Sequence, residues 1–310
     1  MGKKPLILLT GGSGMVGRNI LENPAAENYN FIYPKSEELN LLDFSAVNRY
    51  VSKVNPEFIV HAAGQVGGIQ ANIASPVDFL INNLDMGRNI LLSARNAGVK
   101  KLLNLASSCM YPRLAPNPLS EEYILKGELE PTNEGYALAK IFTLRLSEYI
   151  NKEDETLNYK TFIPCNLYGK YDNFETAYSH LIPAIIHKVH CAKIKNDKTV
   201  EIWGDGSARR EFMYVGDLAK AIFKAFENFE KTPNLLNIGT GIDYSINEYY
   251  QTIADVIGWS GDFTYNLKMP VGMRQKLVSI TRQSKWGWKP ETSLRSGIKN
   301  SYDYYLEINN

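Results

Sequence analysis

The chain has 310 residues, 44% of them hydrophobic, which suits one large or two unequal domains with a sizeable core. A net charge of +1 and the lack of any apolar stretch of membrane-spanning length give no sign of a nucleic-acid or membrane partner. The cysteines Cys109, Cys165 and Cys191 are odd in number and widely spaced, which argues against a disulfide framework and for a reducing compartment.

The first feature in chain order is a strand followed by a glycine-rich loop. Leu6–Leu9 is a short apolar run that predicts a buried strand, and it leads into Gly11, Gly14 and Gly17. Glycines at this spacing let the backbone turn tightly, approach a pyrophosphate and pack a helix against the strand. The apolar run is too short for a signal peptide, so we expect a cytoplasmic protein. The predicted dinucleotide-binding loop consists of Gly11, Gly12, Ser13, Gly14, Met15, Val16 and Gly17.

A second strand is predicted at Tyr29–Tyr33, and the residues that follow it determine whether NAD or NADP is bound. An acidic residue there would bond the ribose 2′-hydroxyl of NAD, whereas a cation would accept the 2′-phosphate of NADP. This strand is followed by Lys35 and Ser36, and the acids Glu37 and Glu38 come only afterwards. We therefore favour NADP with Lys35 as its contact, and a solvated surface lysine is the open alternative.

The next segments continue an alternation of strands and helices. Glu57–Gly64 predicts a strand that ends in small residues. Ser75–Pro76 predicts the start of a long helix, with a hydroxyl cap and a proline at the first helical position, and Gly98 marks its end. Lys101–Ala106 predicts a further strand, which delivers Ser107 to the carboxyl edge where open α/β sheets bind ligands.

Tyr136 and Lys140 form the next notable pair. No proline or glycine interrupts Tyr136–Ile150, and its apolar residues recur at helical spacing, so the two side chains should lie one turn apart on the same face. An ammonium held ~4 Å from a phenol interacts with it by roughly 4 kcal/mol, which would lower the phenol's pKa from near 10 to about 7. The pair therefore predicts a proton donor and acceptor near neutral pH.

The alternation predicts an α/β protein with a Rossmann-type doubly wound parallel sheet. Tyr159–Ile163 is the last strand of the regular pattern, and the alternation of strands and helices ends at about Tyr168. We expect a dinucleotide-binding domain over residues 1–168 and about 213–243. A smaller α/β substrate lobe should comprise about 169–212 and 244–310.

The glycine loop and the Tyr-x-x-x-Lys pair together resemble the short-chain dehydrogenase/reductase superfamily, in its extended, nucleotide-sugar-modifying branch. The resemblance implies that the loop binds a nicotinamide dinucleotide and that Tyr136 transfers a proton. It also implies that Lys140 tunes the phenol and bonds the nicotinamide ribose, that Ser107 bonds the reacting carbonyl, and that Asp43 bonds the adenine amino group. Dehydratases of this fold carry an acid pair where this chain has Ser108 and Cys109, so dehydration is disfavoured.

A narrower resemblance covers nearly the whole chain and points to the GDP-L-fucose synthases. That family epimerises C3 and C5 of a GDP-4-keto-6-deoxymannose and then reduces the C4 ketone with NADPH. The motifs that carry the resemblance are Val66–Ile69, Ser107–Pro112, Glu130–Glu134, Asn166–Gly169 with Asp172–Phe174, and Ser179–Pro183.

This second resemblance assigns further roles. Cys109 and His180 would be the base and the acid of epimerisation, because a ketone acidifies the neighbouring C–H groups and a nearby cation can lower a thiol's pKa. The remaining cofactor contacts would be Pro164, Asn166, Leu167 and His180. The substrate contacts would be Ser108, Asn133, Lys188, Trp203 and Arg210. No metal-ligand spacing occurs among the four histidines and three cysteines, so no metal site is expected.

Three positions depart from the GDP-L-fucose synthase pattern. Ser13 and Ser36 stand where that family carries arginines for the 2′-phosphate, which weakens the NADP assignment. Ser279 stands where the family has an acid in the substrate lobe, so a related GDP-4-keto sugar such as a heptose is favoured over the fucose precursor.

Two other functions stay open on the sequence alone. One is a nucleotide-sugar 4-epimerase that retains NAD, and the other is a non-catalytic dinucleotide-binding sensor. Whatever the function, the resemblance implies that the helix after Ser75 and the Tyr136 helix form a dimer interface, so a homodimer is expected.

Overall fold

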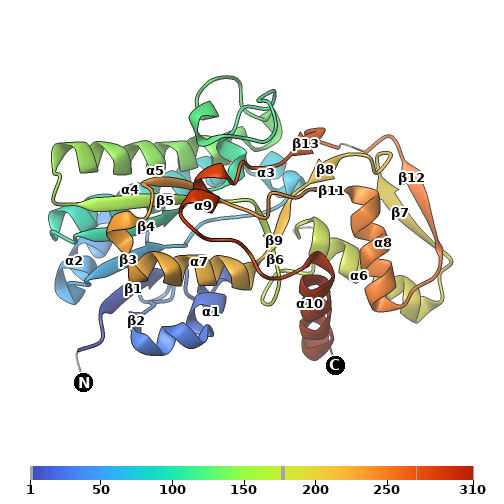
Figure 1. Ribbon diagram of the computed structural model, residues 1–310, viewed down its shortest axis with the longest axis horizontal. Coiled ribbons are helices and arrows are strands. Elements are labelled where there is room, and N and C mark those ends of the chain that lie inside the picture. The colour runs from blue at the N-terminus through green and yellow to red at the C-terminus, as the bar shows by residue number, and fades with distance from the viewer. Residues whose placement is uncertain (1–2, 176–178, 270, 310) are drawn as a thin grey trace.

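The computed structural model describes residues 3–175, 179–269 and 271–309. Its centre is a six-stranded parallel sheet in the order β10-β5-β4-β3-β1-β2, with α1 and α7 on one face and α2, α4 and α5 on the other (Figure 1). The predicted doubly wound α/β fold is therefore confirmed. The strands are β1 (Leu6–Thr10), β2 (Asn30–Ile32), β3 (Phe58–His61), β4 (Lys101–Leu105), β5 (Asn158–Pro164), β6 (Asn166–Tyr168), β7 (Thr199–Trp203), β8 (Arg209–Arg210), β9 (Phe212–Tyr214), β10 (Leu235–Ile238), β11 (Tyr244–Ser245), β12 (Asp262–Asn266) and β13 (Gln275–Lys276). The α-helices are α1 (Met15–Leu21), α2 (Phe44–Val54), α3 (Ile69–Ala74), α4 (Pro76–Asn96), α5 (Glu134–Glu153), α6 (Leu181–Lys195), α7 (Val215–Glu227), α8 (Ile246–Ile257), α9 (Thr281–Lys285) and α10 (Leu294–Asn309).

The strands read as continuous apolar runs because both faces of the sheet are covered. Ile7 and Leu9 of β1 belong to a core shared with Ile222 of α7. Leu8, which points to the other face, belongs to a second core with Val51 of α2. Successive residues of one strand thus build two cores, which fixes the register of the sheet.

The strand order reverses at β1, and this creates the crevice in which α/β sheets bind ligands. The chain adds β2 on one side of β1 and then crosses to add β3 on the other side. The ends of β1 and β3 are level, because Thr10 pairs with His61. Gly11 follows at once with a φ of 74°, a left-handed conformation that lets the chain turn sharply out of the strand.

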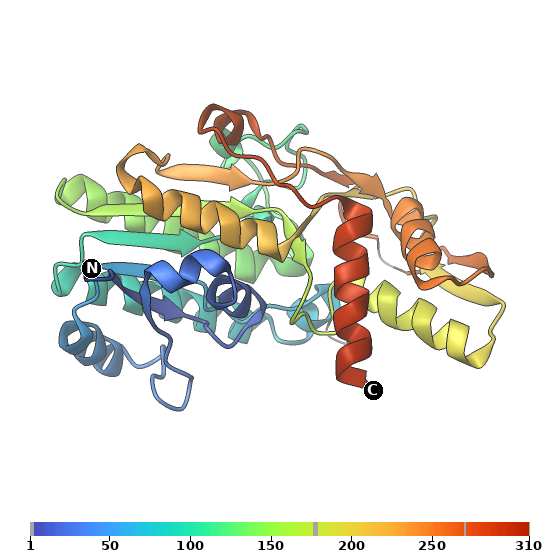
Figure 2. The same cartoon turned by 60° about the horizontal axis from the view of Figure 1, so that its bottom comes forward.

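A separate hydrophobic core lies beyond the carboxyl edge of the sheet. It is built around Ile186 of α6, Tyr249 and Ile253 of α8, and Ile298 and Tyr305 of α10. Both views place α10 at the junction, packed against α6 and α8 and reaching β9 (Figures 1 and 2). The small parallel pair β8–β13 aligns Arg210 with Lys276 in this region. That the two cores correspond to a dinucleotide domain and a substrate lobe stays a prediction.

The helix α4 begins at Pro76 as expected, but the prediction that the Ser75 hydroxyl caps it is wrong. The Ser75 side chain makes no capping hydrogen bond, because its backbone is outside the extended conformation typical of a capping residue, with φ −138° and ψ 55°. Sequence reasoning also missed α2. Its cap is Asp43, whose carboxylate accepts a hydrogen bond of 3.1 Å from Ala46 N.

Two predicted strands are shorter than expected. Tyr29–Tyr33 contributes only β2, and Glu57–Gly64 contributes only β3, because residues 62–64 leave the sheet as a loop. Among the helices of the described residues, none combines the length and the apolar character needed to cross a membrane.

Candidate active site

Strand β4 and helix α5 bring Ser107, Tyr136 and Lys140 together. Tyr136 and Lys140 lie one turn apart on α5, and Lys140 Nζ is 5.6 Å from the centroid of the Tyr136 ring. Lys140 Nζ also donates a hydrogen bond of 3.2 Å to Leu105 O at the end of β4. Ser107 follows that strand, and its hydroxyl accepts a hydrogen bond of 3.3 Å from Cys109 N. The predicted helix that carries Tyr136 is confirmed as α5. Ser107, Tyr136 and Lys140 lie together at the carboxyl edge of the sheet.

The protonation of Tyr136 differs from the prediction. Burial raises its pKa far above the ordinary value, the nearby Cys109 adds to the rise, and hydrogen bonding to Ser107 opposes it. Burial also lowers the pKa of Lys140 to about 8. The prediction that the ammonium lowers the phenol's pKa towards neutrality is therefore wrong for the protein alone, because desolvation disfavours the charged form of both groups. The phenol is therefore protonated at neutral pH.

Cys109 and His180 are also held in their uncharged forms. Burial raises the pKa of the Cys109 thiol, and the field of Lys276 opposes the rise without overcoming it. Burial lowers the pKa of His180, and Lys276 lowers it further. The expectation that a nearby cation brings the thiol towards neutral pH is thus wrong for the protein alone, since desolvation dominates.

Lys276 is a site residue that sequence reasoning missed. Its charge acts on Cys109 and His180, and its own pKa is lowered by burial and by the charge of Arg210. It reaches this position through the pairing of β13 with β8. Its sequence neighbours, Gln275 and Leu277, gave no local signal that distinguishes it from a surface lysine.

The glycine loop has one position that the fold itself does not explain. A Cβ at Gly11 would lie 2.7 Å from Ala63 N, and one at Gly17 would lie 2.2 Å from Gly11 O, so the chain's own packing requires both glycines. A Cβ at Gly14 would meet nothing closer than Gly11 O at 3.5 Å. The absence of a side chain there leaves the loop surface open to a ligand, as a bound pyrophosphate requires.

The residues predicted to select the cofactor lie near the surface. Lys35 and Ser36 are exposed; Lys35 N donates to Glu38 Oε2 at 2.9 Å, and Ser36 Oγ donates to Glu37 Oε1 at 3.2 Å. Asp43, expected at the adenine, is exposed and has one carboxylate oxygen engaged as the cap of α2. Their contacts with a cofactor stay predictions.

The remaining predicted cofactor residues lie at the end of the sheet's fifth strand. Pro164 ends β5, and Asn166 and Leu167 begin β6. Asn166 Nδ2 donates a hydrogen bond of 2.9 Å to Glu211 O, which ties β6 to the segment that follows β8. The position at a carboxyl strand end fits cofactor binding.

Three predicted substrate residues lie on α6, β7 and β8: Lys188, Trp203 and Arg210. Lys188 on α6 lies with its Nζ 5.3 Å from the Trp203 ring centroid. Arg210 is held in place by hydrogen bonds of 2.8 Å to Arg209 O and 2.9 Å to Val271 O. Together with Lys276, these residues offer two ammonium groups and a guanidinium, which is suitable chemistry for a diphosphate.

Two further predicted substrate residues adjoin the segments that carry Ser107 and Tyr136. Ser108 is buried at the start of a short 3₁₀ helix, Ser108–Met110. Asn133 precedes α5, and its buried Oδ1 finds no hydrogen-bond partner among the described residues. Such an atom is suited to accept a hydrogen bond from a ligand.

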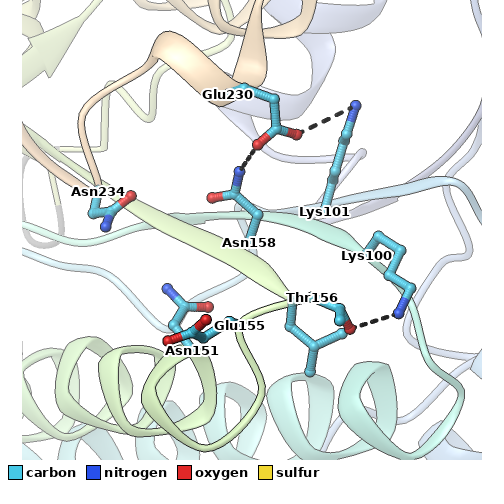
Figure 3. A pocket seen from close by; sticks show the side chains of 9 residues that line it. Lys100, Lys101, Asn151, Glu155, Thr156, Asn158, Glu230 and Asn234 are labelled. Carbon is cyan, nitrogen blue, oxygen red and sulfur yellow. Dashed lines mark hydrogen bonds and ion pairs between the residues drawn. The ribbon is translucent and has the colours of Figure 1, made fainter.

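A cavity of about 310 Å³ lies at the opposite edge of the sheet, where β4 and β5 begin. Five of its polar side chains interact with one another (Figure 3): Asn158 Nδ2 donates to Glu230 Oε2 at 2.6 Å, Lys101 pairs with Glu230 at 3.9 Å, and Lys100 donates to Thr156 at 2.7 Å. No predicted site residue lines it, so we place the candidate site at the carboxyl edge.

Comparison with known proteins agrees with this geometry. Residues 7–239 match the NAD dependent epimerase/dehydratase family. The chain is 53% identical to GDP-L-colitose synthase from Yersinia pseudotuberculosis over 98% of its length and 99% of that protein. It is 51% identical to GDP-L-fucose synthase from Azorhizobium caulinodans over 100% of its length and 99% of that protein.

A solved structure agrees in fold. A GDP-mannoheptose C4 reductase from Campylobacter jejuni with NADP bound superimposes with a TM-score of 0.89 at 31% identity. The match covers 99% of both chains.

Replacing two glycines of the loop should separate ligand binding from folding. We expect Gly14→Ala to fold with a loss of no more than about 1 kcal/mol, the scale of a helix-cap change, yet to bind NADPH at least tenfold more weakly. The matched Gly17→Ala variant should lower the melting temperature, because its Cβ would overlap Gly11 O. Thermal melts and fluorescence titration with NADPH measure both effects. Unchanged NADPH affinity in Gly14→Ala would exclude the loop as the pyrophosphate site.

Proposed function

The chain belongs to the NAD dependent epimerase/dehydratase family, and on that premise we propose that it is an NADPH-dependent 4-reductase of a GDP-4-keto sugar. The single observation that carries the proposal is the shared position of Ser107, Tyr136 and Lys140 at the carboxyl edge of the sheet. Relatives with more than half of their residues identical are named as GDP-sugar synthases, which supports the same substrate class.

The proposed reaction uses the protonated phenol as its acid. When bound, the reduced nicotinamide supplies the hydride that C4 of the sugar accepts. Tyr136 then donates its proton to the former ketone oxygen, so the carbonyl becomes an alcohol. Ser107 donates a hydrogen bond to the ketone oxygen, and Lys140 orients the cofactor ribose.

For the cofactor we propose NADPH rather than NADH. Lys35, exposed just beyond β2, supplies a cation for the 2′-phosphate. The relative from Campylobacter jejuni was solved with NADP bound, which supports the same preference. Ser13 and Ser36 offer hydroxyl groups in place of charges.

For the substrate we propose a GDP-4-keto-6-deoxyhexose or a GDP-4-keto-heptose. Lys188, Arg210 and Lys276 supply the positive charge for the diphosphate, and Trp203 supplies an aromatic face. Ser279 lies three residues after Lys276, and its Oγ donates a hydrogen bond of 3.2 Å to Thr281 Oγ1. A hydroxyl there can bond a sugar without the charge of a carboxylate, which favours a sugar other than the fucose precursor.

A second activity, epimerisation at C3 and C5, is favoured by the position of Lys276. Its charge is the largest influence that opposes the effect of burial on the pKa of the Cys109 thiol, and it lowers the pKa of His180. A thiolate stabilised in this way would remove a proton next to the ketone, and His180 would return one to the opposite face of the ring.

We also propose that the protein is a homodimer. In the single chain, neighbouring helices α4 and α5 expose apolar side chains that a partner copy would cover, including Val77 at 68%, Ile81 at 45%, Leu138 at 42% and Tyr149 at 61% exposure. Exposed apolar surface of this kind marks interaction sites.

The reductase activity is tested by following nicotinamide absorbance with NADPH and GDP-4-keto-6-deoxymannose or a GDP-4-keto-heptose. We expect Tyr136→Phe to lower kcat by about 10²–10⁴, the usual contribution of general acid catalysis, with NADPH affinity unchanged. Tyr149→Phe, on the same helix but exposed, is the matched control and should keep full activity.

If the wild type oxidises no NADPH with any of these substrates, the proposed function is wrong. Tightly retained NAD together with a C4-epimeric product would identify a 4-epimerase instead. Cofactor binding without any turnover would identify a sensor.

Epimerisation is tested separately by running the reduction in deuterated water. Deuterium at C3 and C5 of the product, detected by NMR, is expected for the wild type and should disappear in Cys109→Ser, which keeps the ketone reduction. If the wild-type product carried no deuterium, the protein would be a reductase without epimerase activity.

The dimer is tested by placing charge on the apolar face of α5. Leu138→Glu combined with Phe142→Glu should convert a dimer to a monomer in sedimentation velocity at micromolar concentration, because two carboxylates would be desolvated in the interface. Lys152→Glu, exposed near the end of the same helix, is the control and should remain dimeric. A wild type that sediments as a monomer would contradict the proposal.

A further inference from the structure

Glu211 is a fully buried carboxylate at the junction of the two lobes. It follows Arg210 directly and precedes β9. Its Oε2 accepts a hydrogen bond of 2.8 Å from Val278 N. Its Oε1 accepts hydrogen bonds of 2.6 Å from Thr240 N and 2.8 Å from Gly241 N. One side chain therefore joins the turn after β10 to the segment after β13, whose Val278 belongs to the core of the sheet.

The main chain of Glu211 strengthens the same junction. Its N–H donates a hydrogen bond of 3.2 Å to Lys276 O, and its carbonyl accepts one of 2.9 Å from Asn166 Nδ2. Glu211 thus holds the chain on both sides of Leu277, through Lys276 O and Val278 N. The far side of this segment is held by Leu119, whose N–H donates to Leu277 O at 2.7 Å.

The surrounding packing leaves the carboxylate no alternative position. A Cβ at Gly239 would lie 2.4 Å from Glu211 Oε1 and 2.5 Å from Val278 Cγ2, so this glycine is needed for the approach. Burial raises the pKa of Glu211, and the N–H groups of Val278, Gly241 and Thr240 counter the rise. A buried carboxylate surrounded by donors in this way is costly to replace by a group that must itself donate.

We propose that Glu211 is a positioning residue for the substrate's diphosphate, because it fixes the strand that carries Lys276 against the strand that carries Arg210. Lys276 of β13 and Arg210 of β8 are opposite each other in the register of the two strands. Glu211 anchors this pairing twice: its backbone N–H bonds Lys276 O, and its side chain accepts a hydrogen bond from Val278 N. The spacing of the two cations is thereby set before any ligand arrives, which lowers the cost of ordering them on binding. The inference rests on the proposed function for the identity of the anion.

The alternative is that Glu211 only stabilises the fold. Asp217 offers a matched comparison, because it is equally buried and its Oδ2 accepts hydrogen bonds from Glu291 N at 3.2 Å and Thr292 N at 2.9 Å. It lies in the first turn of α7 and holds no residue of the candidate site. Loss of either carboxylate should reduce stability, but only Glu211 should affect the site.

The test uses the full chain with GDP as the probe, measured by titration calorimetry, and NADPH affinity measured in parallel. In Glu211→Gln the amide has one acceptor oxygen, so the NH₂ group must face an N–H donor and release either Val278 or the Thr240 turn. We expect GDP affinity to fall at least tenfold and NADPH affinity to change less than twofold. Asp217→Asn should keep both affinities while lowering the melting temperature.

A double variant shows whether Glu211 acts through Lys276. Lys276→Met alone should weaken GDP binding, and adding Glu211→Gln to it should cost less than twofold more, because coupled residues are not additive. Equal loss of GDP affinity in Glu211→Gln and Asp217→Asn, or full additivity with Lys276→Met, would overturn the inference. A wild type that binds NADPH but no GDP would instead overturn the proposed substrate class, so the two failures are distinguishable.

Discussion

Desolvation acts on every ionisable group where β4 meets α5. It raises the pKa values of Tyr136 and Cys109 and lowers that of His180, so these three groups favour their uncharged forms, whereas Lys140, with its pKa lowered to about 8, stays mostly protonated at neutral pH. The phenol is then a proton donor from the start, which suits reduction of a ketone. The charge of Lys276 partly opposes the raised pKa of the thiol, whereas it lowers the pKa of the imidazole further, so it assists only the thiol. The chemistry of the site thus depends on how the second lobe delivers that lysine.

The two lobes contribute different parts of this site. The sheet domain supplies the glycine loop, Ser107 and the Tyr136 helix, all at strand or helix ends fixed by the parallel sheet. The second lobe supplies the cations Lys188, Arg210 and Lys276 from a helix and two short strands. The buried hydrogen bonds of Glu211 tie the segment that follows Lys276 to the turn after β10, and they therefore hold Lys276 in a fixed place relative to the sheet.

Local patterns were enough to predict the sheet, the glycine loop and the Tyr136 helix, because strand burial, turns and helix faces are set by residues close in sequence. Lys276 and Glu211 could not be found in this way. Their positions depend on pairing between segments more than sixty residues apart, as between Glu211 and Val278. The pKa of Cys109 was predicted in the wrong direction for a related reason: burial is a property of the whole fold, whereas the charge of a neighbour can be guessed from a motif. The Ser75 cap failed because backbone angles, not residue type, decide whether a hydroxyl reaches the helix.

The sheet's edge strand β10 pairs with β5, yet α6 and β7 of the other lobe lie between them in sequence. During synthesis on the ribosome, the six-stranded sheet therefore stays incomplete until Ile238 has emerged, and by then α6 and β7 are already exposed. Their apolar surfaces stay exposed until α8 and α10, which follow them in sequence, have been synthesised. Both hydrophobic cores of the nascent chain therefore stay incomplete for a long part of synthesis. The contacts that complete them join segments distant in sequence.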